Sequence, residues 1–239
     1  MHALRKDTDM TTAKHRRWIA ATLAAAALSL AACGGGDPAP VMRVDASGTS
    51  TMDAANLATQ LAALPLQTLS SAEAQGLAMM REEERLAHDV YAASAALWGT
   101  PVFANIADSE ATHTAAVLAL LARYGLPDPL AGLPEGVFFT PSFQALHDAL
   151  VATSRGSLVD ALTVGVQIEE LDIRDIAALR AGTDNADLQL VYDNLQRGSR
   201  NHLRSYVKLL TQQGGSYVPQ YITPAEFDAI VGSPIETGP

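Results

Sequence analysis

The chain of 239 residues has a single cysteine, Cys33, so no disulfide within the chain can hold its fold together. Paired-cysteine motifs, glycine-rich phosphate loops, a recognisable nucleophile elbow and the His-Glu-x-x-His motif are also missing. The sequence therefore gives no signature of a nucleotide-binding protein, a serine hydrolase or a zinc peptidase. The formal net charge is −10 at pH 7, and a surface of that charge argues against nucleic acid as a partner.

The N-terminal segment predicts export and a lipid anchor. Basic residues up to Arg17 precede an apolar run over residues 18–32, which is too short for a comfortable membrane span and is typical of a secretory signal. The run ends in Leu-Ala-Ala before Cys33, which resembles a bacterial lipoprotein box. We therefore expect a signal peptide over 1–32. The mature protein would then be anchored to the membrane of the bacterial cell envelope through a lipid on Cys33, on the periplasmic side or at the cell surface.

The segment after the anchor is predicted to be a flexible tether over residues 33–68, because it is rich in Gly, Ala, Thr, Ser and Asp. One compact domain is then expected over 69–231, followed by a tail over 232–239.

Capping signals and apolar periodicity predict four long amphipathic helices in this domain. They are expected over about residues 70–99, 100–125, 157–182 and 183–214, with a last short helix from the capping box at Thr223 and Glu226. Because very few residues separate the first helix from the second, and the third from the fourth, each pair should form an antiparallel hairpin. The proline-rich segment 126–156 is long enough to cross from one pair to the other, and it contains a short helical stretch. This all-α pattern indicates a ferritin-like four-helix bundle.

The apolar seam of each long helix is interrupted near its midpoint by a residue that can bind a metal. In the second helix, Glu110 and His113 occupy adjacent core positions one turn apart, so both can reach one ion. Carboxylates and imidazoles rarely occupy core positions unless they are paired or coordinate an ion, because burying an uncompensated charge is costly. The candidate metal ligands are Glu84, Glu110, His113, Glu169 and His202.

This pattern resembles the ferritin-like di-iron bundles, which carry one Glu on each of two helices and Glu-x-x-His on each of the other two. The spacing of Glu84 to Tyr91, and of His202 to Tyr206, is similar to the rubrerythrin branch. Four strings within about 69–230 resemble the bacterial family filed as domain of unknown function 2202. They are REEERLAHDVY at 81–91, SEATH at 109–113, IEELDI at 168–173 and GSRNHL at 198–203. The resemblance implies the bundle fold and the metal ligands, but no established activity.

The sequence departs from the family pattern in the fourth helix, where Ser199 stands in place of a Glu three residues before the histidine. Asp172 is the alternative fourth carboxylate, and Glu170 lies on an alternative seam of the same helix. Tyr91 and Tyr206 are interpreted as core aromatics that could also hydrogen-bond to ligands. Three glutamates and two histidines would hold two metals weakly or one metal well.

Carboxylates combined with imidazoles suit iron, with manganese or zinc as alternatives. The sequence thus predicts an envelope-anchored protein with a mononuclear or dinuclear non-haem iron site that reacts with peroxide or dioxygen. Two alternatives stay open. One is a metal-buffering module without turnover, and the other is a structural or interaction bundle in which Arg81, Arg85 or Arg180 pairs with the buried acids. The redox partner is unknown, and a homodimer is also left open.

Overall fold

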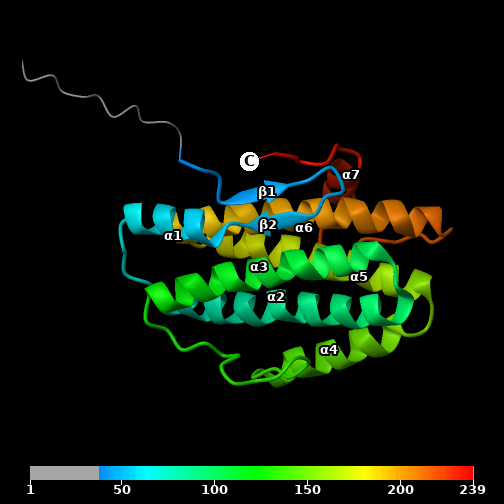
Figure 1. Cartoon of the computed structure of the whole chain (residues 1–239), viewed down its shortest axis with the longest axis horizontal. Coiled ribbons are helices and arrows are strands. Elements are labelled where there is room, and N and C mark those ends of the chain that lie inside the picture. Colours follow the sequence, from blue (N-terminus) through cyan, green and yellow to red (C-terminus); the bar gives the residue numbers. More distant parts are fainter. Residues whose placement is uncertain (1–37, 239) are drawn as a thin grey trace, which may run out of the picture. The chain divides into compact units, whose positions relative to one another are not determined.

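The computed structural model describes residues 38–238, and this part of the chain is predominantly helical (Figure 1). In chain order the elements are β1 (Met42–Val44), β2 (Ser50–Met52), α1 (Ala54–Ala63), α2 (Ser71–Trp98), α3 (Pro101–Arg123), α4 (Pro141–Ser154), α5 (Leu158–Ala181), α6 (Ala186–Gln212) and α7 (Pro224–Val231). The predicted all-α class is confirmed. The predicted signal peptide and Cys33 lie outside the described residues. Within these residues, no helix is both long and apolar enough to cross a bilayer.

The ends of the long helices follow their capping residues. Ser70 and Glu73 form the predicted capping box of α2, and Gly99 ends that helix with a φ of 61°, in the left-handed region that favours glycine. The fourth long helix, α6, begins at Ala186, slightly later than predicted. The reason is that the hydroxyl of Thr183 donates a hydrogen bond to Glu73 and accepts one from the backbone of Asn185, which keeps this turn out of the helix.

The four long helices lie side by side (Figure 1). The most extensive contacts join α2 to α3 and α5 to α6, and α3 also packs on α6 while α2 packs on α5. The connection between α3 and α5 carries α4, which packs against α2 and α5. The four long helices thus enclose a common interior.

That interior contains two apolar clusters separated by a polar layer. One cluster includes Leu77, Val117 and Leu195, and the other includes Leu86 and Phe103. Between the two clusters, each long helix contributes buried polar residues to the interior. The apolar clusters keep bulk water away from this layer, so the polar groups in it must find partners within the protein or bind an ion.

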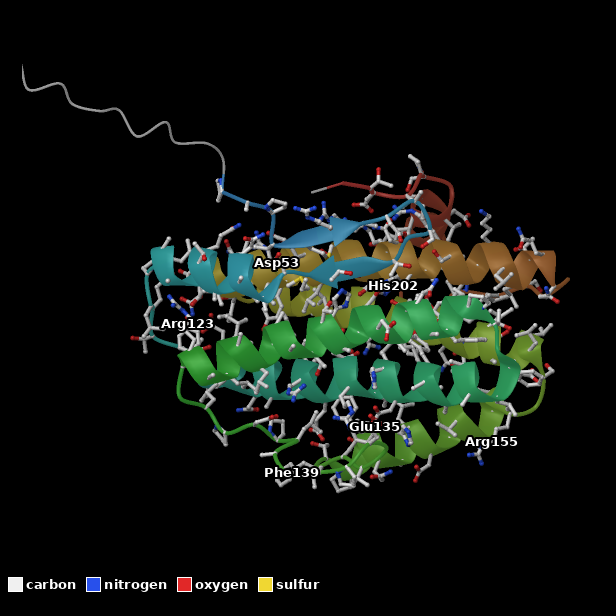
Figure 2. All side chains as sticks on the ribbon, viewed as in Figure 1. Asp53, Arg123, Glu135, Phe139, Arg155 and His202 are labelled. Carbon is white, nitrogen blue, oxygen red and sulfur yellow. The ribbon has the colours of Figure 1, made fainter. Side chains whose placement is uncertain are left out.

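The prediction of a flexible tether over 33–68 is wrong for residues 42–63, which form β1, β2 and α1. The two strands pair antiparallel, and their inward residues alternate with outward ones: Met42 and Val44 are buried opposite Met52 and Ser50. Asp53, which Figure 2 labels near the start of α1, caps this helix by accepting hydrogen bonds from two backbone amides. The hairpin formed by β1 and β2 packs on α3 through β2, and the side chain of Arg197 on α6 donates to the carbonyl of Met42. Packing against the long helices thus holds this segment in place, although it is rich in small and polar residues.

Candidate metal centre

The five predicted ligands come from all four long helices and meet in the polar layer. Each is at most 1% exposed. Their ligand atoms form two groups, and within each group the atoms lie within 4.8 Å of one another. The first group is Glu84, Glu110 and His113, and the second is Glu110, Glu169 and His202. Glu110 belongs to both groups, so the geometry has room for two ions that share one carboxylate.

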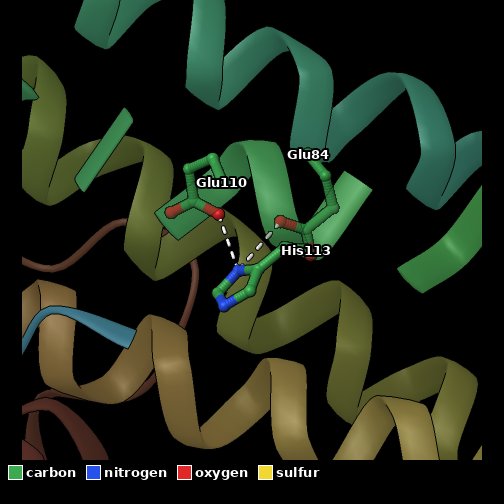
Figure 3. Close-up of side chains that lie close together, drawn as sticks. All are labelled: Glu84, Glu110 and His113. Atoms are coloured by element: carbon green, nitrogen blue, oxygen red, sulfur yellow. Dashed lines mark ion pairs between the residues drawn. The ribbon is translucent and has the colours of Figure 1, made fainter. Parts of the chain in front are cut away.

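Glu110 places one carboxylate oxygen toward each imidazole. Its Oε2 lies 2.7 Å from Nδ1 of His113, and its Oε1 lies 2.8 Å from Nδ1 of His202. Glu84 approaches the first imidazole at 3.4 Å, and Glu169 approaches the second at 3.5 Å. Figure 3 shows Glu84 and Glu110 converging on the same ring nitrogen of His113. The two halves of the centre therefore have the same composition and nearly the same distances.

The close approach of these atoms does not form hydrogen bonds. Nδ1 of both histidines, both oxygens of Glu84 and both oxygens of Glu110 are buried and have no hydrogen-bond partner among the described residues. An ion pair between an imidazolium and a carboxylate would normally direct its N–H bond at the oxygen. These buried ligand atoms lie close together without hydrogen bonds, so they could coordinate a cation between them.

The ionisable groups of the centre shift one another's pKa. Burial disfavours the charged imidazolium of His113, but the carboxylates of Glu110 and Glu84 outweigh it and raise its pKa to about 10. The same balance, with Glu110 and Glu169 as partners, raises the pKa of His202 to about 9. Burial raises the pKa of Glu84 to about 8 and that of Glu169 to about 7, although the neighbouring histidines oppose the shift. Burial acts on Glu110 in the same direction, but the two imidazoles lower its pKa overall.

A serine that the sequence did not predict contacts both histidines from the opposite side. Oγ of Ser50, on β2, lies 2.9 Å from Nε2 of His113 and 3.0 Å from Nε2 of His202. Its backbone amide donates a hydrogen bond to the hydroxyl of Ser109 on α3. Because Ser50 occupies the Nε2 side of both rings, it fixes the rings with Nδ1 facing the carboxylates.

A glycine on α6 makes room for this arrangement. The rings of His113 and His202 are stacked with their centroids 5.4 Å apart. A Cβ atom added to Gly198 would lie 2.5 Å from Cε1 of His113 and 3.2 Å from Oγ of Ser50. Only a residue without a side chain leaves this space, so Gly198 is part of the site although it offers no ligand atom.

The two predicted aromatics and Ser199 surround the ligands in different ways. The hydroxyl of Tyr91 donates a 2.7 Å hydrogen bond to Oε1 of Glu169. The ring of Tyr206 packs on that of Tyr91, but its hydroxyl has no partner among the described residues. The hydroxyl of Ser199 donates a hydrogen bond to the carbonyl of Leu195 on its own helix instead of to a ligand.

The acidic residues near the ligands in the sequence do not belong to the two groups of ligand atoms. Glu170 faces away from the centre and accepts hydrogen bonds from Tyr217 and from the backbone of residues 220–222. Glu82 accepts two hydrogen bonds from Thr140. Asp172 is buried beside the centre, but it belongs to neither group of ligand atoms.

The three arginines that could have neutralised the acids pair elsewhere. Arg81 binds Asp128 and the hydroxyl of Thr114. Arg85 pairs with Asp89, four residues along the same helix, and Arg180 pairs with the surface residue Asp193. The alternative in which Arg81, Arg85 or Arg180 pairs with the candidate ligands is therefore wrong for these three residues.

Comparisons with known proteins give relatives without an assigned activity. A family model described as an uncharacterized protein domain (DUF2202) matches residues 73–234. The chain is 46% identical over 178 residues to the uncharacterized protein MJ0754 of Methanocaldococcus jannaschii, an alignment that covers 74% of this chain and 96% of that protein. The crystal structure of the hypothetical protein MJ0754 matches with a TM-score of 0.71 at 47% sequence identity, over 72% of this chain and 99% of that one. Because this relative is archaeal, the similarity is not confined to bacteria.

Proposed function

The chain belongs to the DUF2202 family of uncharacterised proteins, and on that premise we propose that it is a metal-binding protein whose buried centre holds two ions bridged by Glu110. We further propose that its long helices form a ferritin-like bundle. Two observations support this assignment. The helices pair as α2 with α3 and α5 with α6, and the connection between the pairs is long and carries α4.

The observation that carries the proposal is the set of unpartnered ligand atoms. Two imidazole nitrogens and the oxygens of Glu84 and Glu110 are buried, lie close together and lack hydrogen bonds. A polar core that served only to set the helix register would gain stability from satisfying these atoms, because unsatisfied buried polar groups are costly. A cation at each of the two positions would satisfy them.

The ligand set suits iron, and manganese or zinc can use the same atoms. Glu84, Glu110 and His113 would hold one ion, and Glu110, Glu169 and His202 the other. Iron held there would supply one-electron chemistry toward peroxide or dioxygen. The protein's own residues orient the ligands: Ser50 holds both imidazoles, and the hydroxyl of Tyr91 holds Glu169.

Elemental analysis tests this proposal. The full chain, purified without chelator and then supplied with Fe²⁺ under anaerobic conditions, is expected to retain about two ions per chain. The Glu82→Gln variant is the control and should retain as much metal as the unaltered protein. Glu82 is also buried on α2, but its carboxylate already accepts two hydrogen bonds from Thr140. Retention of less than about a tenth of an ion per chain would favour a purely structural centre over a metal site.

We propose that the protein is attached to the cell envelope through a lipid on Cys33, as the sequence before this residue suggests. The formal charge of −10 also agrees with a protein that does not bind nucleic acid. Cys33→Ala should move the protein from the membrane fraction to the soluble fraction, and a labelled fatty acid should be incorporated only when Cys33 is present. Incorporation into the Cys33→Ala variant would refute the assignment of the anchor.

A further inference from the structure

Two buried carboxyl groups beside the centre are not used by it. Glu83 lies on α2 next to Glu84, and Asp172 lies on α5 one turn after Glu169. Glu83 is 2% exposed and Asp172 is fully buried. None of their four carboxyl oxygens has a hydrogen-bond partner among residues 38–238. Buried acids without donors are costly, so this pair is also suited to receive a cation.

The two groups interact with each other and with the centre. Burial raises the pKa of Asp172 well above its ordinary value, and the charges of Glu83, Glu84 and Glu169 raise it further. Burial also raises the pKa of Glu83 to about 8, with a contribution from the charge of Asp175. Glu83 and Asp172 are therefore close enough to the ligand carboxylates for their charges to interact, and Glu83 also interacts with Asp175.

Asp175 extends this acidic series to the surface. Glu169, Asp172 and Asp175 follow one another at intervals of three residues along α5, so they share one face of that helix. The side chain of Asp175 is 20% exposed and pairs with Arg174 through both carboxylate oxygens, each at 2.7 Å. The exposure of the carboxyl groups thus falls from Asp175 at the surface to Asp172 and Glu169 in the interior.

We propose that Asp175, Glu83 and Asp172 form an access route for divalent cations, with Glu83 and Asp172 as a transient binding site before the ligands. This inference rests on the proposed metal-binding function. A dehydrated cation cannot cross the apolar clusters at the two ends of the helices, whereas a row of carboxylates offers oxygen ligands at each step. An ion that leaves Asp175 would meet Glu83 and Asp172 before it reaches Glu84 and Glu169.

The rate of metal loading separates an access route from a ligand. Co²⁺ is the probe, because its absorption reports binding in a stopped-flow experiment. Glu83→Gln and Asp172→Asn should bind as many Co²⁺ ions per chain at equilibrium as the unaltered protein. Their loading should be slower by about ten-fold or more, because negative charges along a route raise the association rate of a cation by at least this factor. Glu82→Gln should load at the unaltered rate.

Asp175→Asn supplies a test that does not change the core. It should slow loading by about ten-fold as well, and Asp193→Asn, which removes the matching acid of the surface pair with Arg180, should have no effect. If Glu83→Gln and Asp172→Asn fail to fold, the loading rates of Asp175→Asn and Asp193→Asn still test the access route. Unaltered loading rates with full occupancy would overturn the access route alone. Loss of bound Co²⁺ at equilibrium would make Glu83 or Asp172 a ligand and overturn the transient role. Absence of Co²⁺ binding by the unaltered protein would overturn the proposed function as well.

Discussion

The hydroxyl oxygen of Ser50 lies 2.9 Å from Nε2 of His113, although 63 positions separate the two residues in the sequence. The same oxygen reaches the second histidine at 3.0 Å, so one side chain on β2 fixes the orientation of both imidazoles. The orientation of the rings decides which nitrogen faces the carboxylates, and therefore which nitrogen is available to a metal.

We predict that Ser50→Ala weakens metal binding by about 10-fold to 100-fold, the usual effect of removing a group that orients a ligand. Competition with a chromophoric chelator measures the change in Kd. Thr51→Ala is the matched control, because Thr51 is the next residue of the same strand and points outward. Equal affinities for the unaltered protein and Ser50→Ala would show that Ser50 does not orient the ligands.

The shared carboxylate predicts a graded loss of metal. Glu110 belongs to both groups of ligand atoms, whereas Glu84 belongs to one. Glu110→Gln should therefore remove nearly all bound metal, while Glu84→Gln should leave about one ion per chain. Elemental analysis of the two variants, side by side, gives the ratio. Equal losses in the two variants would mean that the ions do not share Glu110.

Gly198→Ala should destabilise the protein by about 1 to 3 kcal/mol, because the new methyl group would overlap His113. At an exposed helical position, Gly→Ala is expected to stabilise a protein by about 1 kcal/mol. A destabilising effect at position 198 would therefore indicate that the methyl group overlaps His113. Denaturant unfolding measures it. Gly182→Ala at the end of α5 is the control, since its Cβ would make only ordinary contacts, the nearest at 3.4 Å. A stabilising Gly198→Ala would show that His113 does not occupy this space.

Glu170 predicts a pH dependence that does not involve the centre. Burial alone would raise its pKa, but hydrogen bonds from Ile222, Tyr217 and Gln220 outweigh burial and lower it. A lowered pKa stabilises the folded state above the pKa of about 4.3 of an unfolded glutamate, and the contribution is lost as the pH falls through the folded value.

Glu170→Gln should therefore reduce the free energy of unfolding by about 1 to 3 kcal/mol at neutral pH. The difference from the unaltered protein should shrink below about pH 4, which urea unfolding at a series of pH values would measure. Asp228→Asn on the exposed side of α7 serves as the control. A difference that grows on acidification would contradict this assignment.

The positions of the long helices and of the five ligand candidates could be predicted because both depend on local patterns. A capping box such as that of Ser70 and Glu73 acts within one turn, and a residue such as His113 interrupts an apolar seam within its own helix. The identity of the metal and its chemistry are not encoded in such patterns, since iron, manganese and zinc use the same atoms.

The role of Ser50 could not be predicted in the same way. Each strand of its hairpin has three residues, too few for the alternation of inward and outward side chains to stand out, and the segment has the composition of a linker. Its order depends on contacts with α3 and α6, which are distant in the sequence. The burial of Glu83 could not be predicted for another reason. Helix α2 packs against α3, α4 and α5, so residues on several of its faces are buried, and one apolar seam does not identify them all.

The position of the first strand would limit how far the protein could stand from a membrane if it is anchored as proposed. Its first strand begins at Met42. If the lipid is carried by Cys33, only the few residues between these two positions separate the bilayer from the folded body. At about 3.3 to 3.6 Å per residue, even a fully extended segment of this length reaches about 30 Å, less than a third of the span available to a tether that ran to residue 68. The helices would then lie close to the lipid surface. There, the negative charge of the protein and that of anionic headgroups would together attract cations from solution.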